Sequence, residues 1–305
     1  MSFVLGLDAG GSKTIAAIAD PTGTVLRRFE GPSLDPHHVS DWQSLLAGAI
    51  AEVCGGETPE AAVLGLPMHG EIVSLSQEQQ RVADTLLPCP HLVLNDVEVA
   101  YDGAFTCKSG VLLLAGTGSM AWAKAGATSL RVGGWGDAFG DEGSAFWIGR
   151  QALSLASQAL DGRSRAHDFA QGILSACGCT AETLIDWAYA QQNSRAGVGG
   201  LARHVDAMAD SGDASAVQLL IGAAELLAAH VEAARFRLAD PTLAWSHAGS
   251  VFGSRTITHH LETLLGASST PKLPPAGGAI WRAGTLAGWP IEDRFAPTVS
   301  ACLQP

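Results

Sequence analysis

The stretch Phe3-Val-Leu-Gly-Leu-Asp8-Ala-Gly-Gly-Ser-Lys-Thr14 is an apolar run that ends in an aspartate and continues with glycines and small polar residues. The run predicts a strand over residues 3–8, and the glycines predict a tight turn into a second strand over 14–19. A further turn at Pro21-Thr-Gly23 leads into a third strand, expected over 24–29. We therefore predict that three antiparallel strands joined by short turns open the chain.

Beyond these strands the chain alternates between helical and strand-like patterns. Helices are expected over 41–53, 77–87 and 97–104, and short buried strands over 61–66 and 91–94. This order of elements predicts an α/β lobe that ends near Lys108-Ser-Gly110. The first domain is therefore predicted to span residues 1–109.

The same order of elements begins again at Gly110. Leu112-Leu-Leu-Ala-Gly116-Thr-Gly-Ser119 repeats the arrangement of an apolar strand followed by a glycine-rich turn. Strands are expected over 110–115, 120–124, 129–133 and 243–247, whereas residues 144–238 and 277–287 have helical spacing. We therefore predict a second lobe over 110–288 that duplicates the architecture of the first and carries helical insertions. The segment 289–305 is expected to pack back on the first lobe.

An acidic, glycine-rich segment separates the second set of strands from the helices. It reads Gly133-Gly-Trp-Gly-Asp-Ala-Phe-Gly-Asp-Glu-Gly-Ser-Ala-Phe-Trp147 and holds five glycines, two aspartates and a glutamate. Because glycine disfavours regular helix and strand, we predict a loop that runs into a helix near Ser144. Such a loop can direct backbone amides and carboxylates toward a polar ligand. The alternative is a tight turn before a well-capped helix.

Composition argues against several classes of function. Thirty acidic residues against eighteen basic ones give a net charge of −12, and there is no basic run. Neither nucleic acid nor an anionic membrane is therefore expected as a partner. No signal-peptide pattern is found and no apolar run reaches about 18 residues, which predicts a cytoplasmic protein. The six cysteines are scattered and only Cys177-Gly-Cys179 is a close pair, so reduced thiols are expected.

Two glycine turns are candidates for phosphate binding. The turn after Asp8 lets backbone amides approach a phosphate, and Asp8 is placed to hold Mg²⁺ through water. The turn Gly116-Thr-Gly-Ser119 has the same chemistry, so the two together could clamp a triphosphate. The turn after Asp8 matches neither the Gly-x4-Gly-Lys-Ser/Thr nor the Gly-x-Gly-x-x-Gly pattern. The alternative for each is an ordinary β-turn.

Two further junctions carry candidate chemistry. Asp96 follows a buried strand, where a carboxylate in a cleft is well placed as a general base. The alternative is that it caps the helix beginning at Val97. His247-Ala-Gly249-Ser250 lies between a strand and a helix, where backbone could accept the flat face of a nucleobase or ribose. The alternative there is an ordinary loop.

Taken together, these motifs resemble the N-acetylglucosamine kinase branch of the BadF/BadG/BcrA/BcrD ATPase family. The resemblance rests on Asp8-Ala-Gly-Gly-Ser-Lys-Thr, Asn95-Asp96, Ala115-Gly-Thr-Gly-Ser, Ala248-Gly-Ser-Val-Phe and the block from Gly133 to Ala145, and it spans residues 1–288. It implies an α/β fold of two ribonuclease-H-like lobes, as in the actin/hexokinase/Hsp70-like superfamily, with ATP in the cleft between them. It also implies a homodimer and a kinase whose acceptor is an amino sugar.

The resemblance implies roles for individual residues. The first phosphate loop would contain Asp8, Gly10, Gly11, Ser12, Lys13 and Thr14, with Asp8 also serving Mg²⁺. The second would contain Gly116, Thr117 and Gly118, with Thr117 on the γ-phosphate of ATP, while Ala209, Gly249 and Ser250 would line the adenosine pocket. Asp96 would take the proton of the sugar 6-hydroxyl. The residues that would hold the sugar are Ser119, Gly133, Gly134, Trp135 and Asp141.

Two positions depart from the family pattern. Relatives carry an asparagine where Gly31-Pro-Ser-Leu-Asp35 places an aspartate. A carboxylate there would pair with the ammonium of free glucosamine better than with the N-acetyl group of N-acetylglucosamine. Leu66-Pro-Met-His69-Gly70 replaces a small-residue turn of the relatives, which would reshape the sugar pocket. Asp35 is therefore a candidate substrate residue, and the choice between the two sugars stays open.

Two other functions fit the same fold. One is an ATP-driven activator of a 2-hydroxyacyl-CoA dehydratase, which needs paired cysteines around an iron–sulfur cluster that bridges a dimer. Cys177 and Cys179 do not lie in that sequence context. The other is a non-catalytic sensor of ATP or sugar, for which the chain offers no evident DNA-binding module.

Overall fold

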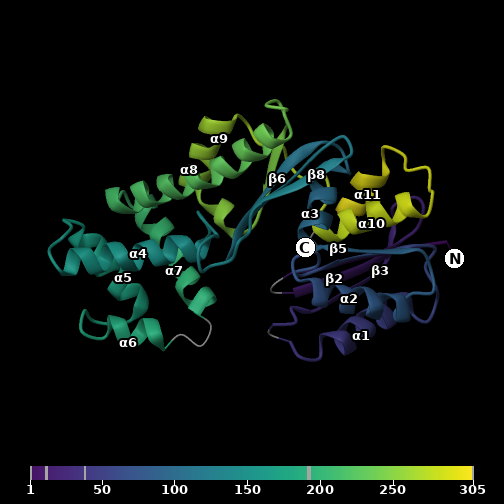
Figure 1. Ribbon diagram of the computed structural model, residues 1–305, viewed down its shortest axis with the longest axis horizontal. Helices are drawn as coiled ribbons and strands as arrows, with labels where there is room; N and C mark the ends of the chain where they lie inside the picture. Colours follow the sequence, from purple (N-terminus) through teal and green to yellow (C-terminus); the bar gives the residue numbers. More distant parts are fainter. Residues whose placement is uncertain (1, 11–12, 38, 191–193, 304–305) are drawn as a thin grey trace. The chain divides into compact units, whose positions relative to one another are not determined.

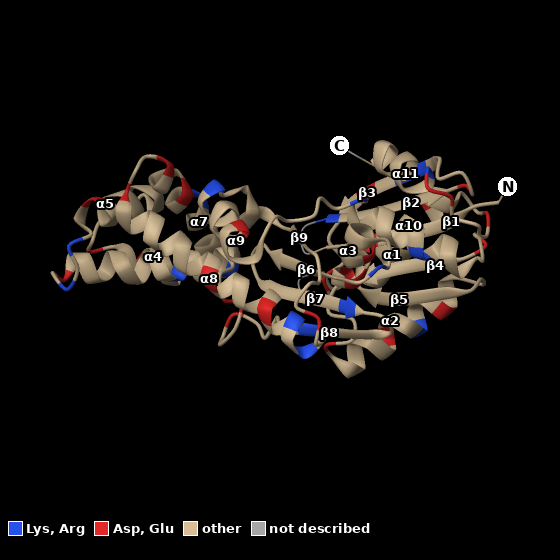
Figure 2. Cartoon of the chain, turned by 90° about the horizontal axis from the view of Figure 1, so that it is seen from above, with Lys and Arg blue, Asp and Glu red and all other residues tan. Residues whose placement is uncertain are grey.

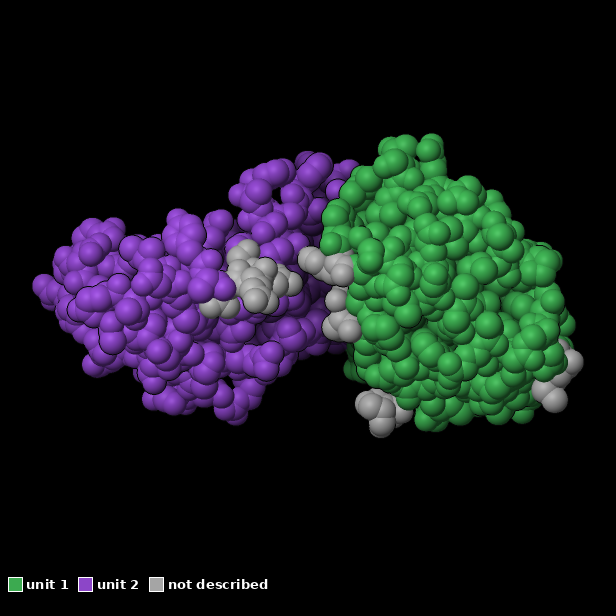
Figure 3. Space-filling model, turned by 90° about the horizontal axis from the view of Figure 1, so that it is seen from below, with its two compact units in different colours: residues 1–109, 270–305 green, residues 110–269 purple. Residues whose placement is uncertain are grey.

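The computed structural model describes residues 2–10, 13–37, 39–190 and 194–303. The chain forms two compact units (Figures 1 and 3): unit 1 comprises residues 1–109 and 270–305, and unit 2 comprises residues 110–269. The chain passes from unit 1 to unit 2 at the boundary expected near Lys108-Ser-Gly110. The predicted end of the second lobe at residue 288 is wrong, because the chain returns to unit 1 at Thr270.

Unit 1 is built on a five-stranded sheet with the order β3-β2-β1-β4-β5. Its strands are β1 (Val4–Ala9), β2 (Lys13–Ala19), β3 (Val25–Pro32), β4 (Ala62–Leu66) and β5 (His91–Asn95). The first three pair antiparallel, as the short turns between them predict, and β4 and β5 run parallel to β1. The carboxyl ends of β1, β4 and β5 therefore meet at one edge of the sheet.

Helices cover both faces of this sheet. One face holds α1 (Trp42–Cys54) and α2 (Val73–Leu86), and the other holds α3 (Asp96–Phe105), α10 (Pro275–Leu286) and α11 (Phe295–Leu303). The alternation of side chains along β1 explains this division. Leu5 and Leu7 belong to the apolar layer of α1 and α2, whereas Val4 packs in the layer of α10 and α11. The expected return of segment 289–305 to this unit corresponds to α11.

Helix α10 belongs to unit 1 because small residues allow its backbone to approach the sheet and α3. A Cβ atom added at Gly6 of β1 would lie 2.5 Å from the backbone nitrogen of Ile280. One added at Gly278 of α10 would lie 2.3 Å from the backbone nitrogen of Gly103 in α3. The spacing of apolar residues predicts this helix. The elements against which its small residues pack, β1 and α3, cannot be read from the local sequence.

We expect Gly278→Ala to lower the free energy of unfolding by about 2 kcal/mol, the usual scale for overpacking a tight contact. The added methyl carbon would lie 2.1 Å from the carbonyl oxygen of Val99, so α10 would have to move away from α3. Gly48→Ala is the matched control, since Gly48 also lies within a helix of unit 1 and its added Cβ meets no described atom within 4 Å. The control should gain up to about 1 kcal/mol from helix propensity. Urea unfolding followed by circular dichroism measures both, and equal shifts in the two variants would contradict the packing argument.

Unit 2 repeats this strand order in a four-stranded sheet, β8-β7-β6-β9. Its strands are β6 (Gly110–Ala115), β7 (Ser119–Ala125), β8 (Thr128–Gly133) and β9 (Trp245–Ala248). The first three pair antiparallel and β9 runs parallel to β6, just as β4 runs parallel to β1. The α/β class and the internal duplication of architecture are therefore confirmed.

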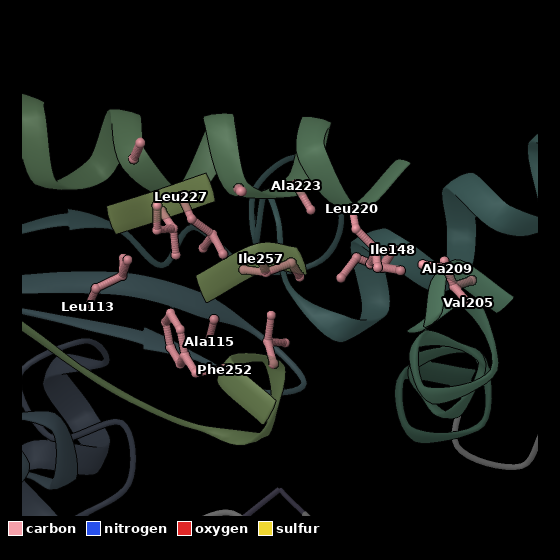
Figure 4. Packing of buried hydrophobic residues seen from close by; sticks show 14 of the residues in the cluster. Leu113, Ala115, Ile148, Val205, Ala209, Leu220, Ala223, Leu227, Phe252 and Ile257 are labelled. Atoms are coloured by element: carbon pink, nitrogen blue, oxygen red, sulfur yellow. The ribbon is translucent and has the colours of Figure 1, made fainter. Parts of the chain in front are cut away.

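Helical insertions separate β8 from β9 in unit 2. They are α4 (Ala145–Leu160), α5 (His167–Cys177), α6 (Leu184–Tyr189), α7 (Ser194–Asp210) and α8 (Ala214–Arg237), and β9 is followed by the short helix η1 (Ser250–Gly253) and α9 (Arg255–Leu265). Figure 4 shows the core of this unit, where Leu113 of the sheet, Leu227 of α8 and Ile257 of α9 belong to one buried cluster. Among the described helices, α8 alone is long and apolar enough to cross a membrane, and 44% of its most apolar stretch is buried within unit 2.

Charged side chains are scattered over both units (Figure 2). Several ion pairs lie at the surface, such as the pair of Lys13 and Glu30, whose side chains are 53% and 48% exposed. Exposed pairs of this kind contribute little to stability because water screens them. The pair of Arg195 and Asp141 differs, since the Asp141 side chain is only 5% exposed. A buried carboxylate of this kind indicates a specialised site.

Candidate functional site

The first candidate phosphate loop is the turn between β1 and β2. The backbone nitrogen of Gly10 donates to the carbonyl oxygen of Lys13 at 3.0 Å, which closes a tight hairpin directly after Asp8. The Lys13 ammonium lies 3.1 Å from a carboxylate oxygen of Glu30. Gly11 and Ser12, which are predicted members of this loop, lie outside the described residues.

Thr14, another predicted member of the loop, is directed away from it. Its side chain is buried, and its hydroxyl donates to the carbonyl oxygen of Pro32 at 2.7 Å. The hydroxyl therefore ties β2 to β3. The alternation of the strand explains the difference, because Thr14 pairs with Ala9 in the ladder and is no longer part of the turn.

Asp8 and Asp96 lie at the sheet edge where the parallel strands end. Burial, and after it the negative charge of Asp96, together raise the pKa of Asp8 to about 8, although the Lys13 ammonium opposes the shift. Burial likewise raises the pKa of Asp96 to about 6, against the lowering effect of a hydrogen bond from Val97. Two partly buried carboxylates in this relation repel each other when both are ionised, and a cation between them would relieve the repulsion. A few carboxylates that meet phosphate oxygens form the donor set that Mg²⁺ prefers, so these residues fit that metal.

Asp96 begins α3, but its neighbour supplies the helix cap. The Asn95 side chain accepts a hydrogen bond from the backbone nitrogen of Val97 at 3.0 Å and forms a capping box with Glu98. Asp96 also accepts from Val97, at 2.9 Å through Oδ1. The alternative, in which Asp96 caps the helix, is therefore only partly confirmed. Asn95 is the N-cap residue, and Asp96 adds a second acceptor for the Val97 nitrogen. The carboxylate of Asp96 is held in place by this helix start.

Two further carboxylates influence Asp96. The largest influences on the pKa of Asp96 are burial, which raises it, and the hydrogen bond from Val97, which lowers it. The negative charges of Glu71 and Asp35 raise the pKa by smaller amounts. Glu71 accepts a hydrogen bond from the Asn95 side-chain nitrogen at 3.2 Å. Asp35 accepts one from the backbone nitrogen of His37 at 3.0 Å. Sequence reasoning missed Glu71, although it follows the turn after β4, the strand between β1 and β5.

In unit 2, the second candidate phosphate loop is fastened to the start of α4. The backbone nitrogen of Ala145 donates to the Gly116 carbonyl at 2.8 Å, and that of Phe146 donates to the Thr117 carbonyl at 3.4 Å. The nitrogen of Trp147 donates to the Ser144 hydroxyl at 3.1 Å. Loop and cap oxygens therefore satisfy the first amides of α4 within the chain.

The acidic loop is held against the same turn. Asp141 accepts hydrogen bonds from the backbone nitrogen of Ser119 at 3.3 Å and from Nη2 of Arg195 at 2.5 Å. The Ser119 hydroxyl, a predicted sugar contact, donates to the Glu142 carbonyl at 2.7 Å. Burial raises the pKa of Asp141, although Ser119 and Arg195 both oppose that shift. Sequence reasoning missed Arg195, which lies 54 positions after Asp141 and carries no local motif.

Gly133, Gly134 and Trp135 mark the end of β8, next to this turn. Gly133 and Gly134 have φ angles of 73° and 70°, which are left-handed values that favour glycine. The backbone nitrogen of Gly134 donates to the Ser119 carbonyl at 3.1 Å. The Trp135 ring is 64% exposed, and the Arg131 guanidinium carbon lies 5.4 Å from its centroid. An exposed ring of this kind is available for stacking.

A cavity of about 440 Å³ opens in unit 2 beside Thr117. Its polar lining comes from Thr117, Ser250 and Ser254 and from Arg203 and Asp206 of α7, and Ile148, Leu220 and Ile257 line it with apolar carbon. This mixture of an apolar surface and a few polar groups is typical of pockets for small ligands. Because Thr117 and Ser250 were predicted at the two ends of the nucleotide, the cavity is the candidate nucleotide site.

Two of the predicted adenosine residues lie outside this lining. Ala209 is buried in the core of unit 2 near Val205 (Figure 4), and Asp206, one helical turn earlier, lines the cavity instead. Gly249 has a φ of 114°, and a Cβ there would lie 2.3 Å from the Ala115 carbonyl oxygen. Gly249 therefore lets η1 approach β6 and positions Ser250 without lining the cavity itself.

Comparison with known sequences yields relatives of one kind. The pattern of the BadF/BadG/BcrA/BcrD ATPase family matches residues 5–280. The N-acetylmuramic acid/N-acetylglucosamine kinase of Clostridium acetobutylicum is 28% identical over 244 residues, which are 76% of this chain and 79% of that protein. The N-acetyl-D-glucosamine kinase of Dictyostelium discoideum is 28% identical over 206 residues, which are 61% of this chain and 64% of that protein.

Solved structures share the fold over almost the whole chain. A proposed N-acetylglucosamine kinase from Chromobacterium violaceum has a TM-score of 0.76 at 24% identity, covering 94% of this chain and 99% of that one. A ROK family glucokinase from Streptomyces griseus, solved with glucose and AMPPNP, has a TM-score of 0.55 at 17% identity, covering 93% and 99%. At these identities the likeness concerns the fold.

Proposed function

The chain belongs to the BadF/BadG/BcrA/BcrD ATPase family, and on that premise we propose that it is an ATP-dependent kinase that phosphorylates an amino sugar at the 6-hydroxyl. The observation that carries the proposal is the partly buried carboxylate of Asp96, which interacts with Asp8 at the edge where the parallel strands of unit 1 end. With a pKa raised to about 6, Asp96 is ionised at neutral pH and more basic than an ordinary aspartate. Both sequence relatives named above are sugar kinases, which supports the same reaction.

Each unit contributes one part of the reaction. In unit 2, the cavity beside Thr117 and Ser250 would hold adenosine, and the turn of Gly116 and Thr117 would contact the phosphates. In unit 1, Asp8 would hold Mg²⁺ through water, and this ion would neutralise charge on the phosphates of bound ATP. Residues near Asp96 would hold the sugar.

The chemical step would be a direct transfer. Asp96 would accept the proton of the 6-hydroxyl as its oxygen forms a bond to the γ-phosphorus. The bond from that phosphorus to the β,γ-bridging oxygen would break, and ADP would leave with the electron pair. Positioning and charge stabilisation contribute most of the acceleration in such transfers.

The acceptor is proposed to be glucosamine or N-acetylglucosamine. The relatives act on N-acetylated sugars by name. The carboxylates of Asp35 and Glu71, whose charges both affect Asp96, add negative potential that suits a free ammonium group. A coupled ADP-release assay with Mg²⁺–ATP and each sugar, with glucose and with no sugar tests the proposal. We expect turnover to depend on an amino sugar, and release that is independent of sugar would refute the kinase function.

Asp35→Asn is expected to lower kcat/KM for glucosamine about tenfold relative to that for N-acetylglucosamine, which corresponds to about 1.4 kcal/mol. The Asp35 side chain is only 19% exposed, so an ammonium beside it would be partly desolvated and its charge pairing strengthened. N-acetylglucosamine serves as the internal control, because its amide carries no charge. An unchanged ratio of the two kcat/KM values would remove Asp35 from the recognition of the amine.

Of the two alternative functions, that of a dehydratase activator is disfavoured by the properties of Cys177 and Cys179 in this chain. Burial raises the pKa of Cys177 to about 12, with Cys179 adding to the shift, whereas a cluster needs thiolates. A sensor without catalysis would bind ATP or sugar and show no turnover in the assay above.

The compartment and the oligomeric state of the protein are inferred from its cysteines and from its family. All six cysteines are free thiols, which suits a reducing cytoplasm. We propose a cytoplasmic homodimer, and light scattering of the purified protein measures its mass against that of one 31.4 kDa chain.

A further inference from the structure

Arg195 lies beside the second phosphate loop of unit 2, although no sequence motif singles it out. Its Nη2 atom lies 2.5 Å from Oδ2 of Asp141. The same atom would lie 3.0 Å from a Cβ added at Gly118, the residue that follows Thr117 in the loop. The absence of a side chain at position 118 therefore leaves room for a guanidinium group next to the turn.

The pair with Asp141 uses only part of the hydrogen-bonding capacity of Arg195. A guanidinium has five N–H donors, and among the described residues Nε is buried without a hydrogen-bond partner. The Oδ2 atom of Asp137 lies 4.0 Å from Nε, which is too far for a hydrogen bond. An arginine that served only to hold Asp141 would leave this buried donor unexplained.

Helix α7 connects Arg195 to the cavity. Ala196, Gly199, Gly200 and Arg203 line the cavity from successive turns of α7, and Thr117 lines it from the phosphate loop. Arg195 and Gly199 are four positions apart and so share a face of the helix. The guanidinium therefore lies where the α7 lining and the phosphate loop come together.

We propose that Arg195 binds the terminal phosphates of ATP held in this cavity and stabilises the charge that develops on the transferred phosphoryl group. The proposal rests on the function proposed above. Asp141 would hold the guanidinium beside Gly118, and the remaining N–H donors would meet the phosphate oxygens. Arginine suits this task because its planar fork matches phosphate geometry and its charge is permanent.

Kinetics and nucleotide affinity distinguish this role from a structural one. We expect Arg195→Ala to lower kcat by about 100-fold or more, the scale for losing one charge-stabilising donor. We also expect its ATP affinity, measured by calorimetry without sugar, to fall at least about tenfold (~1.4 kcal/mol) while its AMP affinity stays near that of the wild type. Added guanidinium ion should restore part of the lost turnover. Arg163→Gln is the matched control, since Arg163 pairs with Asp161 at the surface of the same unit.

Each outcome decides the proposal. Loss of ATP affinity with AMP affinity retained, together with rescue by guanidinium, supports a phosphate contact. Equal loss of affinity for ATP and AMP would show that Arg195 only maintains the cavity, and unchanged ATP affinity with unchanged kcat would show that it has no role there; either result overturns the proposal. The ATP-to-AMP comparison needs no acceptor, so it still tests Arg195 if no sugar supports turnover in the wild type and the kinase function fails.

Discussion

Replacing Asp96 by asparagine is expected to lower kcat for the amino sugar by about 100-fold or more, the scale for removing a general base. Asparagine has the same shape and can still accept the hydrogen bond from the Val97 nitrogen through its side-chain oxygen, so the start of α3 should persist. It cannot accept a proton from the sugar hydroxyl. Coupled ADP release at saturating ATP and sugar measures the loss, and circular dichroism verifies the fold.

The matched control for this variant is Asp84→Asn. Asp84 lies on α2 of the same unit, its side chain is 60% exposed, and it pairs with His91 at the surface. Its replacement should leave kcat near that of the wild type. If Asp96→Asn retained more than about a tenth of wild-type turnover, proton removal by Asp96 would contribute too little for a general base. The transfer would then depend on positioning and charge stabilisation alone.

Local chemistry allowed much of the fold to be predicted. The glycine turns after residues 8 and 115 follow apolar runs, and the structure has antiparallel hairpins at both. The parallel strands β4, β5 and β9 were recognisable as short apolar runs between helical segments. Both kinds of signal depend on neighbouring residues, which explains why the duplicated strand order is predictable from the sequence.

The contacts that escaped prediction join residues distant in sequence. Glu71 meets Asn95 only because β4 and β5 are adjacent in the sheet, and Arg195 meets Asp141 only because α7 packs on α4. Thr14 and Ser119 carry hydroxyls suited to a ligand, yet partners in the folded chain already bind them. A sequence gives the chemical type of a side chain, whereas its hydrogen-bond partner depends on the tertiary structure.

The carboxylates of Asp8 and Asp96 are expected to lower the free energy of unfolding of the ligand-free protein. Burial and the charge of Asp96 together raise the pKa of Asp8 to about 8, so the ionised form of Asp8 is unfavourable in the ligand-free protein. A buried charge without a partner is destabilising, and functional sites tolerate such costs where a ligand later offsets them. The bound metal and phosphates would supply that compensation.

Asp8→Asn is therefore expected to have opposite effects on stability and on turnover. Without metal or nucleotide, in EDTA, the variant should unfold at a higher urea concentration than the wild type, with a gain of about 1 kcal/mol. On folding, the wild type must either take up a proton at Asp8 or hold a charge beside Asp96, and the neutral amide avoids both costs. With Mg²⁺–ATP and sugar, turnover should fall by about 100-fold or more, since a group that stabilises charge on the phosphates is lost.

The dependence on ligand separates this explanation from simple damage to the fold. Mg²⁺–ATP should stabilise the wild type by about 2.7 kcal/mol at a concentration one hundred times its Kd, and it should stabilise Asp8→Asn much less at the same concentration. Asp20→Asn is the control, because Asp20 lies in the turn after β2, at the end of that strand far from Asp8. Its carboxylate accepts hydrogen bonds from the backbone nitrogens of Thr22 and Thr24. A variant at position 8 that is less stable than the wild type in EDTA would contradict the idea of a repulsive pair. Equal stabilisation of both proteins by Mg²⁺–ATP would contradict the placement of the metal at Asp8, because binding would then not involve its charge.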